Sequence, residues 1–122
     1  MVNRQGEDAR KGKRKTRRQQ VHTLLVELGR KDADGLPEGA SGAAMMVYAS
    51  GIDEAEAVRE TVAVLRQAGL APLEVSGYGT LEERLRDGHD ISEEERALMA
   101  RALRENAVIV ARVTPFFDED GA

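Results

Sequence analysis

The chain has 122 residues, a formal net charge of -4 and no cysteine. This length fits one domain that buries an ordinary core, and the absence of cysteine excludes disulfides, thiolate zinc sites and cysteine nucleophiles. The longest apolar stretches, such as residues 43–49, are far shorter than the roughly 20 residues that cross a bilayer, and no signal-peptide pattern follows the basic N-terminus. These features favour a cytoplasmic protein and disfavour a secreted or membrane-spanning one.

The charge of the chain divides sharply at residue 20. Residues 1–20 contain eight Lys or Arg and two acidic residues, a charge of +6, whereas the remainder contains ten basic and twenty acidic residues, a charge of -10. This asymmetry is typical of a basic arm attached to an acidic globule. The arm is a candidate site for nucleic acid or another polyanion, and the alternatives are a solvated tail or an arm that packs on its own acidic body. The candidate contact residues are Arg10, Lys11, Lys13, Arg14, Lys15, Arg17 and Arg18.

The first predicted element follows the arm. Val21, Leu24, Leu25 and Leu28 have the i, i+3, i+4, i+7 spacing of an amphipathic helix, predicted over residues 16–28, and Gly29 provides a helix stop signal. Such a helix would cover part of the domain or pair with the same helix of a second chain. The glycine-rich residues that follow, up to residue 42, predict a linker.

The next predicted elements are a strand and a helix. Residues 43–49 form a short apolar run of the kind found in buried strands. Asp53 and Glu56 have the spacing of a capping box, which predicts the start of a helix that Gly69 ends. A second strand is predicted after Pro72, where apolar and polar residues alternate.

Two further helices and a strand are predicted in the last third of the chain. Thr80 and Glu83 predict a second capping box and a short helical segment, and Ser92 and Glu95 repeat this spacing before a longer helix that Asn106 ends. Residues 107–113 form the last predicted strand, and residues 118–122 form an acidic tail.

The predicted fold is a small single-sheet α/β or α+β domain over residues 43–117, with the order β-α-β-(short α)-α-β after the N-terminal helix. Right-handed strand–helix–strand crossovers predict both main helices on one face of the sheet, which leaves the other face open. If residues 80–91 formed a strand instead of a short helix, the arrangement would be ferredoxin-like.

Side chains expected on the open face form a possible interaction surface, composed of Tyr48, Tyr78 and Arg112. A base-stacking platform of the kind seen in RNA-binding domains is disfavoured, because the strands lack clustered aromatic residues and Glu74 on the same face would repel phosphate. A subunit contact, or packing against the N-terminal helix, is the preferred interpretation of this surface.

Two loops carry residue types found in active sites. Residues 76–80 lack the third glycine and the lysine of phosphate-binding loops, and are interpreted as a turn. Asp87, His89 and Asp90 combine carboxylates with an imidazole, but no second ligand group stands at a recognisable spacing. The sequence therefore predicts no catalytic residue, metal or cofactor.

The preferred functional hypothesis is a small cytoplasmic binding or regulatory module whose basic arm contacts nucleic acid or another acidic partner. A homodimeric interaction domain that uses the open sheet face or the N-terminal helix is the alternative. An enzyme with a site near His89 is a remote third possibility.

Overall fold

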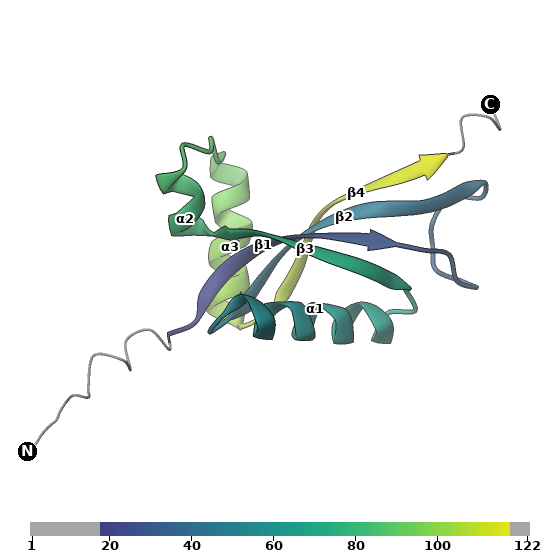
Figure 1. Cartoon of the computed structure of the whole chain (residues 1–122), viewed down its shortest axis with the longest axis horizontal. Coiled ribbons are helices and arrows are strands. Elements are labelled where there is room, and N and C mark those ends of the chain that lie inside the picture. Colours follow the sequence, from purple (N-terminus) through teal and green to yellow (C-terminus); the bar gives the residue numbers. More distant parts are fainter. Residues whose placement is uncertain (1–17, 118–122) are drawn as a thin grey trace, which may run out of the picture.

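The computed structural model describes residues 18–117, which form one four-stranded sheet and three helices (Figure 1). The strand order is β3-β1-β2-β4, and neighbouring strands are antiparallel throughout. The small α+β domain expected from the sequence is therefore confirmed. In chain order, the elements are β1 (Gln20–Leu28), β2 (Ala40–Gly51), α1 (Glu54–Gln67), β3 (Pro72–Thr80), α2 (Leu81–Arg86), α3 (Glu93–Glu105) and β4 (Val108–Phe117).

Strand β1 occupies residues for which the sequence pattern predicts an amphipathic helix, so that prediction is wrong. β1 lies between β3 and β2, with helices packed on both faces of the sheet, and its burial runs unbroken from Val21 to Leu24. A strand buried on both faces has apolar residues at odd and even positions, so periodicity alone does not separate it from a helix. The part of the predicted helix before Arg18 lies outside the described residues.

The ferredoxin-like alternative is also wrong. It required a strand from residues 80–91, but residues 81–86 form helix α2, and the additional strand of the sheet is β1. From Ala40 the chain runs β2-α1-β3-α2-α3-β4, and the additional strand in front makes the complete order differ from the predicted one. Since β1 pairs with both β2 and β3, the segment expected to be a separate helix belongs to the same sheet as the rest of the domain.

The helices cover both faces of the sheet, which corrects the prediction that they share one face. Helix α1 packs on the side chains of Leu24, Val26 and Val47, whereas α3 packs on those of Val21 and Tyr48. These two sets occupy alternate positions along the strands, so their side chains point to opposite faces of the sheet. We call these two sides the α1 face and the α3 face. The crossover rule applies to parallel strands. The rule therefore applies to the connection β2-α1-β3, because β2 and β3 are parallel. β3 and β4 are antiparallel and lie at opposite edges of the sheet, and the connection between them, which contains α3, crosses the other face.

Local capping signals place the helix ends. Two of the three predicted capping boxes are complete, since the Thr80 and Ser92 side chains accept hydrogen bonds from backbone N–H groups three residues later, and the Glu83 and Glu95 carboxylates accept in return. At the start of α1 the Asp53 side chain accepts from the backbone N–H of Glu56, but the Glu56 carboxylate accepts from the N–H of Ile52, so this box is incomplete. Asn106 ends α3 in the left-handed conformation with φ 52°. Within residues 18–117, no helix combines the length and apolar character that crossing a bilayer requires.

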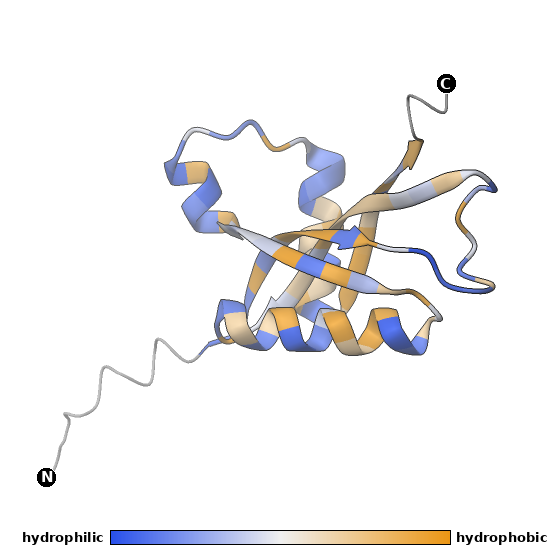
Figure 2. Cartoon of the chain, turned by 45° about the vertical axis from the view of Figure 1, so that its right-hand side comes forward, coloured by the Kyte–Doolittle hydropathy of each residue, from blue (hydrophilic) through white to orange (hydrophobic). Residues whose placement is uncertain are grey.

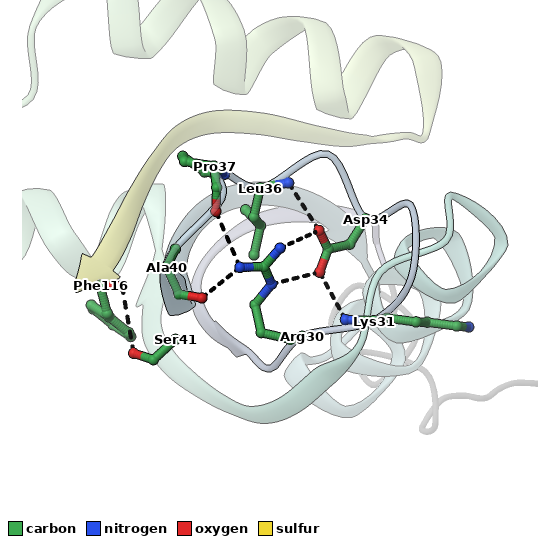
Figure 3. Close-up of polar contacts among 8 residues, drawn as sticks. All are labelled: Arg30, Lys31, Asp34, Leu36, Pro37, Ala40, Ser41 and Phe116. Atoms are coloured by element: carbon green, nitrogen blue, oxygen red, sulfur yellow. Dashed lines mark hydrogen bonds and ion pairs between the residues drawn. The ribbon is translucent and has the colours of Figure 1, made fainter. Parts of the chain in front are cut away.

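The loop between β1 and β2 is held by Arg30 and Asp34 (Figure 3). Arg30 Nε and Nη2 donate to the two carboxylate oxygens of Asp34 at 3.0 and 3.2 Å, and Nη1 donates to the carbonyl oxygens of Pro37 and Ala40. The Asp34 carboxylate also accepts from the backbone N–H groups of Lys31 and Leu36. One ion pair thus fixes both ends of the loop.

We expect stability to depend on Asp34 in a defined acidic range. The Arg30 hydrogen bond and the two backbone donors lower the pKa of Asp34 from 3.8 to about 2. Because the folded pKa is depressed, the stabilisation is fully present above pH 3.8 and is lost as the pH falls through about 2. The melting temperature of Asp34→Asn should therefore lie below that of the wild type near neutral pH, and the gap should close toward pH 2. A gap of constant size across this range would contradict the assignment.

Candidate interaction surface

The α3 face is covered by helices at one end only. Strand register places side chains on this face in successive rows that run from β3 through β1 and β2 to β4. Thr23, Tyr48 and Ile109 share the row beneath α2 and α3. Two further rows continue toward the open end of the sheet. They consist of Ser76, Leu25, Met46 and Arg112, and of Glu74, Glu27, Ala44 and Thr114.

The open rows contain a shallow groove of about 280 Å³. Leu25 and Ala44, both partly buried, contribute its apolar lining, and the aromatic ring of Phe116 joins them from β4. Phe116 is 40% exposed and Phe117 is 55% exposed. Figure 2 shows the hydrophobic end of β4 at the rim of the sheet. Exposed apolar side chains grouped in this way mark interaction sites.

Charges of opposite sign lie on opposite sides of the open rows. Glu27 and Glu74 are direct cross-strand partners on β1 and β3, both exposed, and two like charges in such a pair destabilise a sheet. Arg112 lies on the same face on β4, also exposed. Among residues 18–117, no ion pair joins any of these three side chains to another group. Within residues 18–117 the charges of these three side chains are thus not neutralised by an ion pair.

The structure does not bring the predicted trio of Tyr48, Tyr78 and Arg112 together as one exposed surface. Tyr48 is completely buried beneath α3. Burial raises the pKa of its phenol, and the nearby charge of Glu95 raises it further. Tyr78 is 49% exposed on the edge strand β3, at the opposite edge of the sheet from Arg112 on β4. Of the three, Arg112 lies on the open rows of the α3 face, whereas Tyr48 belongs to the core.

The basic arm joins the sheet at the first residue of β1. Arg18, the last residue of the basic cluster, is exposed in a bend, and Arg10 to Arg17 lie outside the described residues. Gln19 Oε1 accepts a hydrogen bond of 2.8 Å from Ser50 Oγ, which ties the chain to β2. A groove of about 250 Å³ lies at this junction, lined by Arg18, Gln19, Gln20, Val21, Thr80, Leu81, Glu82 and Leu103.

His89 has a local structural contact. Arg84 Nε donates to His89 Nδ1 at 3.0 Å, and Arg84 Nη1 donates to Thr23 Oγ1 at 3.0 Å, so the guanidinium links α2 and the following loop to β1. Asp87 is the C-terminal cap of α2. Residues 18–117 contain no cluster of three potential metal ligands. The hydrogen bond from Arg84 thus fixes His89 in the loop that follows α2.

Sequence reasoning placed Glu74 and Arg112 on one open face, as the structure does, but it missed the residues that β1 contributes there, because β1 was predicted as a helix. Glu27 and Glu74 lie far apart in the chain and meet only where β1 pairs with β3. One signal was available: Phe116 and Phe117 directly follow the apolar residues predicted as the last strand, and β4 extends through both. Recognising this extension would have placed an aromatic ring beside the groove.

A family model described as a Domain of unknown function (DUF8846) matches residues 21–117, the region that contains nearly the whole sheet and all three described helices. No match was found among curated proteins or among solved structures.

Proposed function

The chain belongs to the DUF8846 family of unknown function, and from the division of its charge we propose that it is a small binding or regulatory module whose basic arm contacts nucleic acid. The observation that carries this proposal is the charge of +6 in residues 1–20 beside -10 in the remainder. Arg and Lys side chains bind phosphate and release condensed counterions, which supplies most of the affinity in non-specific nucleic-acid binding. A cytoplasmic location is part of the proposal, and the absence of cysteine is compatible with it.

The acidic body supports a contact confined to the arm. The first turns of α2 and α3 are acidic, and these carboxylates complement the positive ends of the helices, where they oppose phosphate. Arg18 is exposed two residues before β1 begins, so the last charge of the arm lies close to the folded domain. The acidic residues at the two helix starts are Glu82, Glu83, Glu93, Glu94 and Glu95.

Binding through the arm is expected to be electrostatic and largely independent of sequence. Phosphate contacts fix position but do not read bases, and base reading requires groups placed at groove edges or aromatic rings that stack. Tyr48, which might have stacked, is buried. The module would therefore hold a polyanion near the domain without selecting a sequence.

We expect the arm to account for nearly all nucleic-acid affinity. For duplex DNA, log K should fall with log salt with a slope of about -6 if all seven basic residues of the cluster contact phosphate, at about 0.9 per contact. A variant with glutamine at these seven positions should lose measurable binding at physiological salt. Fluorescence anisotropy with generic duplex DNA and single-stranded RNA provides the measurement.

A matched control carries glutamine at exposed arginines of the body. Arg59, Arg66, Arg101 and Arg104 lie on α1 and α3, and their replacement should leave affinity nearly unchanged. Equal affinity of the wild type and the arm variant, or an affinity insensitive to salt, would contradict the proposal. Binding of polyglutamate without binding of DNA or RNA would identify an acidic protein as the partner instead.

A further inference from the structure

The open rows of the α3 face have an apolar centre with charges of opposite sign on either side. Leu25, Ala44 and Met46 lie on the central strands β1 and β2 and are partly buried. Glu74 lies on the edge strand β3 and Arg112 on the edge strand β4, so the acidic and basic groups are separated by the width of the sheet. A sheet face with apolar residues is normally covered by another layer of structure.

This pattern is complementary to itself. Consider a twofold axis that lies between the two sheets, parallel to the strands and above the line between β1 and β2. Rotation about this axis places each row of side chains over the same row of the second copy, and it reverses the order of the strands across the sheet. β3 of each copy then lies over β4 of the other, which places Glu74 over Thr114 of the second copy, one row from Arg112 of the second copy. Rows on one face are about 6.6 Å apart, a separation that a long arginine side chain spans.

The same axis places the apolar residues against one another. Leu25 and Met46 are direct cross-strand partners on β1 and β2, so the rotation brings Leu25 of each copy over Met46 of the other. Two sheets that pack face to face with nearly aligned strands lie about 10 Å apart and interdigitate side chains of this kind. Phe116, at the β4 edge of the face, then lies toward the β3 edge of the second copy.

A second copy fits this face better than the basic arm does. The arm would be attracted by Glu27 and Glu74 but repelled by Arg112, and its basic cluster, residues 10–18, contains no apolar residue that could cover Leu25 and Met46. The same face of a second copy supplies both charges and an apolar centre, each in the required position. In a twofold interface every such contact occurs twice.

We propose that the open rows of the α3 face bind the same face of a second copy of this chain, in a twofold-symmetric dimer in which Glu74 of each copy lies beside Arg112 of the other. The dimer is independent of the arm. It covers the groove and pairs charges that have no partner within the described part of one chain.

Charge reversal with the full-length chain tests this interface. Sedimentation velocity from low micromolar to submillimolar concentration should show the wild type shifting from monomer to dimer. Arg112→Glu and Glu74→Arg should each weaken self-association by at least about 100-fold, because like charges then meet in both halves of the interface. An equimolar mixture of the two variants should dimerise again, since both halves then pair opposite charges.

The controls separate this interface from others. Arg59→Glu and Glu60→Arg change exposed charges on α1, across the sheet from the proposed contact, and should leave the dimer unchanged. Since Arg112 and Glu74 are exposed, their reversal should preserve the circular dichroism spectrum of the fold. A wild type that stays monomeric, with the face covered by its own arm or a different protein, overturns the proposal. A dimer insensitive to both reversals, or variants that do not associate on mixing, overturns it equally.

Discussion

Replacing Tyr48 with alanine is expected to lower the free energy of unfolding by about 3–5 kcal/mol, the range for removal of a buried aromatic ring. The side chain of Tyr48 is completely buried, among the largest in the core, and packs in the cluster that joins α3 to the sheet. Its removal leaves a cavity that rigid strands on either side cannot close. Urea denaturation at constant temperature, followed by far-ultraviolet circular dichroism, measures the loss.

Tyr48→Phe separates the ring from the hydroxyl. The Tyr48 hydroxyl lies 3.9 Å from Met46 Sδ, a weak acceptor, so its removal should change stability by no more than about 1 kcal/mol. A large loss for both variants would assign the effect to the hydroxyl. Full stability of Tyr48→Ala with reduced partner binding would return Tyr48 to the interaction surface on which the sequence pattern placed it.

Gly51→Ala is expected to cost about 1–3 kcal/mol, because the added methyl group would be forced into a packed backbone. Gly51 ends β2, and a Cβ atom there would lie 2.8 Å from Ala57 N and 3.0 Å from Asp53 O. Both atoms belong to the backbone at the start of α1, so neither can rotate away. The same denaturation measurement, made against the wild type, provides the value.

Gly77→Ala is the matched control for Gly51→Ala. A Cβ atom at Gly77 would meet the carboxylate of Glu54, the far end of a flexible side chain that can move aside. Neither glycine has a positive φ, so the two sites differ in their neighbours and not in backbone strain. We expect Gly77→Ala to change stability by at most about 1 kcal/mol in either direction. Equal losses at the two sites would show that contact with the α1 backbone is not the cause.

Local signals predicted much of this fold, and long-range pairing accounts for what they missed. The helices follow from capping residues such as Thr80 and Ser92, whose bonds span three positions. β1 could not be assigned in this way, because its apolar residues serve both faces and give no period of two. The position of α3 also depends on the antiparallel relation of β3 and β4, which no short stretch of sequence encodes.

The candidate surface was harder to predict than the fold. The basic arm is visible as composition alone, since it needs no folded neighbour to gather its charges. Arg112 was correctly expected on a strand, but its counterparts Glu27 and Glu74 become one acidic pair only through the register of β1 with β3. Tyr48 was misread because the sequence does not reveal that a helix covers its end of the sheet.

The central position of β1 has a mechanical consequence. The arm continues directly into β1, which is bonded on both sides, to β2 and to β3. Tension on the arm therefore acts along the strand and loads both antiparallel ladders in shear, so that many backbone hydrogen bonds resist it together. A strand at the edge of the sheet would share the load with one neighbour and peel more readily. An object tethered to the arm would thus pull on one of the two central strands, β1 and β2, which are each bonded to a neighbour on both sides.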